Sequence, residues 1–110
     1  MSGLADTVAD LTGGLPEARM LSGLAWLGAG NAERACLDLR KAMDQGAREQ
    51  KAGGQGCPEA QYHLGVALAK KGAWEEAARA FEAFAADNKA SGRAPWARRA
   101  AELARARGGA

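Results

Sequence analysis

Apolar residues recur every three or four positions along most of this chain, which is the spacing of one face of an α-helix. Leu4, Val8 and Leu11 form the first such stripe, within residues 3–12. No stretch alternates β-branched and polar residues as a half-buried strand would. Alanine, leucine, glutamate and arginine, which favour helix, are abundant, and only 5% of the residues are aromatic. The pattern therefore predicts an all-α fold.

Prolines and glycines divide the chain into successive helical stretches. Proline is tolerated in the first turn of a helix, and glycine adopts the left-handed conformation that often ends one. We expect an N-terminal helix at 3–12, a helical pair within 16–45, a glycine-rich loop at 46–57, a second pair within 58–88 and a last helix at 95–107. Short turns make the two helices of each pair antiparallel neighbours. With 110 residues, the chain is predicted to form one domain.

The two helical pairs repeat each other at an offset of 42 residues. The offset aligns Pro16 with Pro58, Gly23 with Gly65, Trp26 with Leu68, Gly30 with Gly72, Ala35 with Ala77, and Leu39 with Phe81. Internal repeats of this length are typical of helical solenoids. Gly30 and Gly72 are expected to provide the left-handed end of the first helix in each pair.

Two of the repeated glycines lie inside helices, where glycine costs about 1 kcal/mol relative to alanine. Gly23 and Gly65 are therefore expected to allow the second helix of each pair to approach closely. Ala35 and Ala77 are the matching small residues on that second helix. Large apolar side chains, such as Phe81, are expected to fill the space around the contact.

Five positions of the second pair fall on a known repeat signature. Leu64, Gly65, Leu68, Ala77 and Phe81 occupy the L, G, Y, A and F positions of W-x2-L-G-x2-Y…A-x3-F. The chain therefore resembles the tetratricopeptide repeat (TPR) family over roughly residues 16–107. The resemblance implies an α-solenoid with two repeat units, an N-terminal helix and a C-terminal capping helix. Sel1-like repeats, whose units are longer, are a related alternative.

The chain departs from that signature at several positions. Gln61 replaces the tryptophan of the second unit, and Ser22 stands where the first unit should have leucine. In the last helix, Trp96, Ala100 and Leu103 can be aligned with the tryptophan, glycine and aromatic positions. That helix has no second helix to follow it, so we expect it to act as a cap.

The resemblance implies a concave groove lined by the first helix of each unit. The corresponding residues are Met20, Leu24, Leu27, Tyr62, Val66, Ala69 and Lys70. The first three also form an i, i+4, i+7 apolar stripe on one helix. Such a groove suits an amphipathic helix or an extended apolar segment of another protein. An equal alternative is that the N-terminal helix, residues 3–12, covers it.

The C-terminal helix is basic and offers a second candidate surface. Its arginines are Arg98, Arg99, Arg105 and Arg107. A net charge of +2 is too small to imply nucleic acid by itself, and a solvated helix face explains the arginines more simply. Nucleic-acid or acidic-ligand binding is therefore the alternative function. It would weaken steeply with salt.

Candidate catalytic chemistry is sparse in this sequence. Residues 53–55 read GGQ, a tripeptide found in peptide-release factors, but they lie in a glycine-rich loop without the further residues of that motif. His63 has no nucleophile at a suitable spacing, and Cys36 and Cys57 form no metal-binding motif. We therefore expect no enzymatic activity, no cofactor and no metal.

The N-terminus lacks the basic and apolar regions of a signal peptide, and no apolar run approaches the length needed to span a membrane. We expect a cytoplasmic protein that binds another protein as an adaptor, scaffold or chaperone-like module. Self-association through the same groove is a further possibility, because a two-unit solenoid is near the lower limit for stability.

Overall fold

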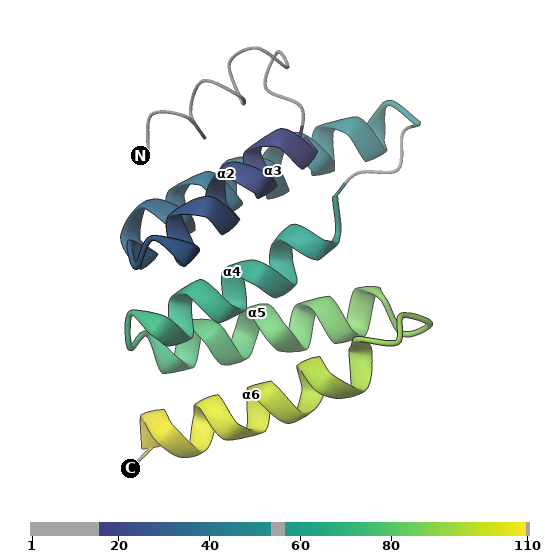
Figure 1. Cartoon of the computed structure of the whole chain (residues 1–110). Coiled ribbons are helices and arrows are strands. Elements are labelled where there is room, and N and C mark those ends of the chain that lie inside the picture. The colour runs from purple at the N-terminus through teal and green to yellow at the C-terminus, as the bar shows by residue number, and fades with distance from the viewer. Residues whose placement is uncertain (1–15, 54–56, 110) are drawn as a thin grey trace.

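The computed structural model of this chain describes residues 16–53 and 57–109. All of the regular secondary structure in these ranges is helical, which confirms the all-α prediction (Figure 1). The helices are α2 (Pro16–Gly28), α3 (Ala32–Lys51), α4 (Glu59–Lys70), α5 (Trp74–Asp87) and α6 (Ala94–Gly109). The helix expected at 3–12 lies outside the described residues.

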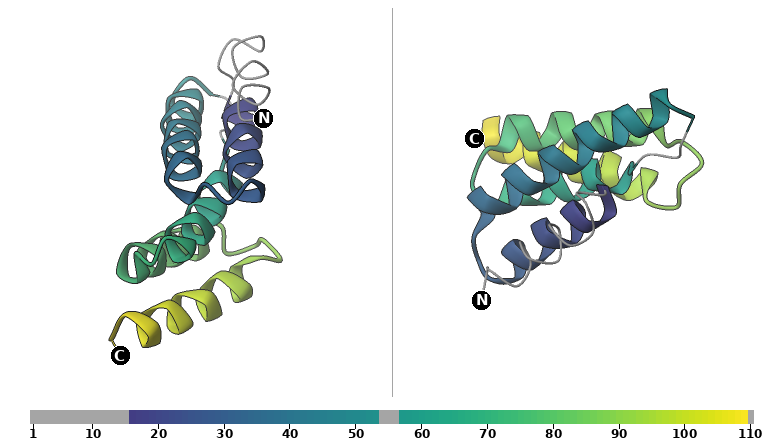
Figure 2. Two further views of the ribbon diagram at one scale, coloured as in Figure 1. Left: turned by 60° about the vertical axis from the view of Figure 1, so that its left-hand side comes forward. Right: turned by 90° about the horizontal axis from the view of Figure 1, so that it is seen from above.

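Each described helix packs mainly against its neighbours in the chain. The pairs α2–α3 and α4–α5 run antiparallel, α3 contacts α4, and α6 lies against α5, while α2 and α4 touch only slightly (Figure 1). The two further views show that the first pair is turned relative to the second (Figure 2). Helices α4 and α6 both pack against α5.

The two helix-internal glycines allow the close approach that the sequence predicts. A Cβ atom built on Gly23 would lie 2.7 Å from Cγ of Leu39, and one on Gly65 would lie 2.8 Å from the ring of Phe81. Both distances are too short for real carbon–carbon contacts. Ala35 is fully buried beside the first of these contacts, with its carbonyl oxygen 3.3 Å from the Cβ position of Gly23. The missing side chains therefore let each pair pack tightly.

The ends of the first helices also repeat at the offset of 42 residues. Gly30 and Gly72 have φ angles of 86° and 85°, as expected for left-handed helix ends. The same six-residue hydrogen bond closes each end, from the Asn31 N–H to the Trp26 carbonyl and from the Ala73 N–H to the Leu68 carbonyl, both at 2.9 Å. The side chain of Asn31 then caps α3, because its oxygen accepts from the Arg34 N–H at 3.0 Å. The sequence repeat thus corresponds to repeated backbone geometry.

The core is built mostly from alanine with a few large side chains. Leu39 and Phe84 are the largest fully buried apolar residues. Tyr62 packs edge-on against the rings of Phe81 and Phe84, with centroid distances of 5.5 and 5.4 Å. Small side chains bring the helix axes close together, so few large residues suffice to fill the interior.

The glycine-rich loop begins later than the sequence predicts. Helix α3 continues through Gly46 to Lys51, so the expected loop at 46–57 is wrong for its first six residues. Residues 47–51 are AREQK, all good helix formers, and they outweigh the single glycine. Within the helix, Gly46 is buried against the chain at Cys57. A Cβ atom at position 46 would lie 2.8 Å from the backbone nitrogen of Cys57, so the close approach requires glycine. Part of the GGQ tripeptide lies outside the described residues.

The last helix packs by a different face from the one that the signature suggests. Trp96 and Leu103 are 69% and 53% exposed, so they do not occupy packing positions of a third unit. The buried stripe of α6 consists of Ala94, Ala97, Ala101 and Ala104. A stripe of alanines fits closely on α5, whereas a tryptophan in that place would hold the helices apart.

Candidate partner-binding cavity

An open, largely apolar cavity of about 870 Å³ lies between the second helical pair and the last helix. Helix α4 forms one wall, α6 forms the other, and α5 contributes Trp74 and Phe81 between them. The lining residues are Val66, Ala69, Lys70, Gly72, Trp74, Phe81, Ala100, Leu103, Ala104, Ala106 and Arg107. This volume lies within the range of about 300–1,000 Å³ that is usual for ligand sites.

Three of the residues expected in the groove line this cavity, namely Val66, Ala69 and Lys70. All three come from α4, where they project from the side that α3 and α5 leave open. Tyr62 was expected beside them, but its ring packs against Phe81 and Phe84 and is not among the lining residues. The second unit therefore supplies one wall of the cavity.

The groove residues expected from the first unit lie elsewhere. Met20 and Leu27 are partly buried and pack against the core. The sulfur of Met20 lies 3.8 Å from that of Cys57, at the far end of α4. Leu24 is half-buried and does not line the cavity. The first-unit stripe thus does not line this cavity with Val66, Ala69 and Lys70.

Helix α6 supplies the opposite wall, which sequence reasoning did not identify. Ala100, Leu103 and Arg107 face the cavity across from α4. The signal was present in the exposed apolar stripe of that helix, where Trp96, Ala100 and Leu103 follow one another at helical spacing. The signature alignment had given these side chains the tryptophan, glycine and aromatic positions of a capping helix.

Two cations lie among the otherwise apolar lining residues. The guanidinium of Arg107 lies 5.5 Å from the ring centroid of Trp74, within the range of a cation–π contact. Lys70 forms no ion pair with any described residue. None of the described lining residues is acidic. The cavity therefore combines apolar walls with a positive rim.

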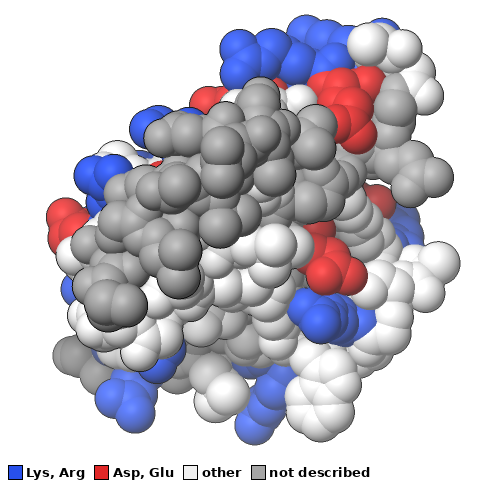
Figure 3. Space-filling view, turned by 45° about the horizontal axis from the view of Figure 1, so that its top comes forward, with Lys and Arg blue, Asp and Glu red and all other residues white. Residues whose placement is uncertain are grey.

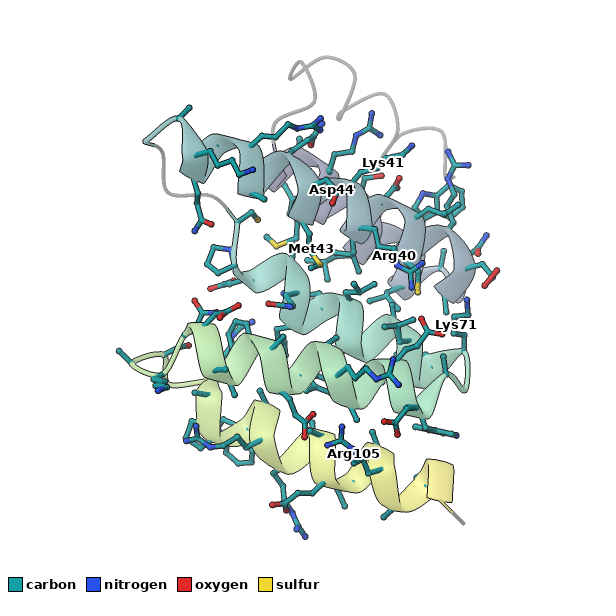
Figure 4. All side chains as sticks on the ribbon, turned by 180° about the vertical axis from the view of Figure 1, so that it is seen from behind. Arg40, Lys41, Met43, Asp44, Lys71 and Arg105 are labelled. Carbon is teal, nitrogen blue, oxygen red and sulfur yellow. The ribbon has the colours of Figure 1, made fainter. Side chains whose placement is uncertain are left out.

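The remaining arginines of the basic C-terminal helix are engaged with carboxylates or spread apart. Arg105 points from α6 towards α5 (Figure 4), where it pairs with Glu82 and lies 3.7 Å from Glu75. This hydrogen bond lowers the pKa of the Glu82 carboxyl. Arg99 pairs with Glu102 at 3.0 Å. The four arginines thus do not form one uncompensated patch.

Ion pairs also connect the two helical units at their back. Arg40 of α3 pairs with Glu76 of α5 at 3.2 Å, and Lys71 pairs with Glu33. The Lys71 ammonium lowers the pKa of the Glu33 carboxyl, which in turn raises the pKa of Lys71. Figure 4 shows Arg40 and Lys71 on the same side of the molecule. Exposed ion pairs of this kind contribute only about 0–1 kcal/mol each to the free energy of unfolding.

The charged surface is mixed elsewhere as well. On the face shown in Figure 3, Lys and Arg side chains alternate with Asp and Glu around uncharged areas.

A buried polar pair in the first unit was not predicted. Ser22 and Asp38 are each 1% exposed, and the Ser22 hydroxyl donates to the Asp38 carboxylate at 2.6 Å. At the offset of 42 residues, the second unit has Leu64 and Ala80, which are both buried in the apolar core. The departure of Ser22 from the signature is therefore matched by a polar residue on the facing helix.

The described residues that carry potential catalytic groups do not assemble into a site. Burial is the main cause that lowers the pKa of His63, with Arg93 adding to it, so the imidazole favours its neutral form. Burial raises the pKa of the Cys36 thiol, which is the opposite of what an activated nucleophile needs. Within residues 16–53 and 57–109, no three His, Cys, Asp or Glu side chains gather to hold a metal. Of the described helices, none has the length and apolarity that crossing a membrane requires.

No protein-family model, curated protein or solved structure matches this chain. The assignment of a function therefore depends on the cavity itself and on the internal repeat.

Proposed function

We propose that this protein is a TPR-like helical-repeat module that binds a segment of another protein in the cavity between α4 and α6. In this role it acts as an adaptor, scaffold or chaperone-like component. The observation that supports the proposal is the apolar lining of the cavity, to which Val66 and Phe81 contribute and in which Leu103 is 53% exposed. A large apolar side chain left open next to others is typical of a protein-interaction site.

The internal repeat supports the same interpretation. Repeat proteins of this kind present the first helix of each unit on a concave surface, where partner segments bind. Val66, Ala69 and Lys70, which the resemblance assigns to that surface in the second unit, line the cavity. In contrast, the pairing of Arg99 and Arg105 with carboxylates argues against the alternative of a nucleic-acid site on α6.

Replacing Leu103 by glutamate should abolish partner binding, because a charge would enter the apolar wall of the cavity. We expect affinity capture with the Leu103→Glu variant to lose the proteins that wild type retains. The matched control is Leu37→Glu on α3, because Leu37 is also 53% exposed but does not line the cavity. Both variants should keep the helical circular dichroism and melting temperature of wild type.

Equal capture by Leu103→Glu and wild type would contradict the proposal. Equal loss in both variants would contradict it as well, since the effect would then not be specific to the cavity. A mass that increases with concentration for wild type and Leu37→Glu, but not for Leu103→Glu, would identify the partner as a second copy of the chain.

A further inference from the structure

The charges at the cavity restrict the chemistry of its occupant. Lys70 and Arg107 approach it from opposite walls, α4 and α6. Neither Lys70 nor Arg107 forms an ion pair with a residue in the described part of the chain, and the guanidinium of Arg107 lies over the uncharged ring of Trp74. By contrast, Arg99 and Arg105 on the same helix have carboxylate partners. The two cations at the cavity can therefore pair with an acidic group from outside without first giving up an ion pair to a described residue.

The walls also determine the conformation of the occupant. Ala69, Ala100, Ala104 and Ala106 are small, so they leave room for large side chains of a partner. Both walls are helices, whose backbone groups are bonded internally along their length. An extended segment would therefore bury backbone N–H and C=O groups that find few acceptors or donors here, whereas a helix satisfies its own.

We infer that the occupant of the cavity is an amphipathic helix with large apolar residues on one face and acidic residues beside that face. This inference rests on the proposed function and specifies the partner for the same site. The apolar face would pack on Leu103, Val66 and Phe81. The acidic residues would pair with Lys70 and Arg107 at the rim, which gives the site a preference for charge as well as for apolarity.

The inference can be tested with a displayed library of random 16-residue peptides, panned at low salt against the full chain. Peptides selected by wild type should carry Leu, Ile, Phe or Trp at a spacing of three or four, together with Asp or Glu. Panning against the Lys70→Glu/Arg107→Glu variant should instead select Lys or Arg at the same positions. A wild-type peptide should bind that variant about 10-fold more weakly, the order expected for losing two exposed ion pairs.

A second double variant controls for net charge. Lys41→Glu/Arg48→Glu changes the net charge equally, on exposed positions of α3 that do not line the cavity. It should select the same acidic peptides as wild type. Apolar peptides without a charge preference, or the same preference in all three proteins, would overturn the inference and leave the proposed function intact. If wild type selected nothing beyond what Leu103→Glu selects, both the inference and the proposed function would be wrong.

Discussion

Replacement of Ala77 by arginine is expected to remove a large part of the stability of the fold. Ala77 is fully buried in the core between the second pair of helices, at the position equivalent to Ala35 in the first pair. An arginine there would either bury an unpaired charge or force α4 and α5 apart. We expect the free energy of unfolding to fall by about 4 kcal/mol or more, which is a large part of the 5–15 kcal/mol that is usual for a domain. Chemical denaturation followed by circular dichroism measures this loss.

The matched control for this variant is Ala86→Arg on the same helix. Ala86 is exposed, so an arginine there keeps its charge in water and changes stability by no more than about 0.5 kcal/mol. If Ala77→Arg unfolded at the same denaturant concentration as Ala86→Arg, the close packing of α4 on α5 would be wrong.

Removing the hydroxyl of Ser22 should destabilise the first unit through its effect on Asp38. The Ser22→Ala change deletes the donor that lies 2.6 Å from a carboxylate with only 1% of its surface exposed. A buried acceptor that loses its partner costs about 1–3 kcal/mol, more when it is charged. The melting temperature of Ser22→Ala should therefore fall by several degrees.

The repeat provides the compensating change. Ser22→Leu combined with Asp38→Ala introduces the residues that the second unit has at these positions, Leu64 and Ala80. Replacing a buried polar pair by well-packed apolar residues is often neutral or stabilising, and the smaller side chain at position 38 leaves room for the larger one at position 22. We expect the double variant to melt at or above the temperature of wild type, although Ser22→Leu alone should be destabilised by overpacking against the carboxylate. A double variant less stable than Ser22→Ala would show that the two units do not share equivalent packing.

Features that depend on local pattern could be predicted from the sequence. The close contacts at Gly23 and Gly65 and the helix ends at Gly30 and Gly72 follow from residues within one pair, and the 42-residue repeat presents each of them twice. Each of these features is set by a helix and its nearest neighbour in the chain.

Features that depend on how the units meet could not be predicted in this way. Met20 and Leu27 have the same apolar spacing as residues that face solvent, but they pack against the core. Leu103 can form a wall of the cavity only because of the face that α6 presents to α5. That face is the alanine stripe, which is buried, whereas the larger Trp96 stays exposed. The spacing of apolar residues shows how many apolar faces a helix has. It does not show which neighbouring helix covers each of these faces.

The pairing of Ser22 with Asp38 is a third kind of feature. The two residues are 16 positions apart, and each alone would be expected at the surface because buried polar groups are costly. Only the joint departure from the second unit, where Leu64 and Ala80 occupy the same places, indicates that they meet. Comparison of the two units with each other can therefore reveal buried polar pairs that hydropathy conceals.

Site-specific photocrosslinking tests the role of the cavity most directly. A photoreactive amino acid would replace Leu103 on the cavity wall or, in a parallel protein, Leu37 on α3, and each protein would be irradiated in the cells that produce it. The proposed function predicts a defined protein adduct from position 103 that is absent from position 37, with the crosslinked partner peptide rich in apolar residues. Identical adducts from both positions, adducts with nucleic acid alone, or no adduct from position 103 would contradict a partner bound between α4 and α6.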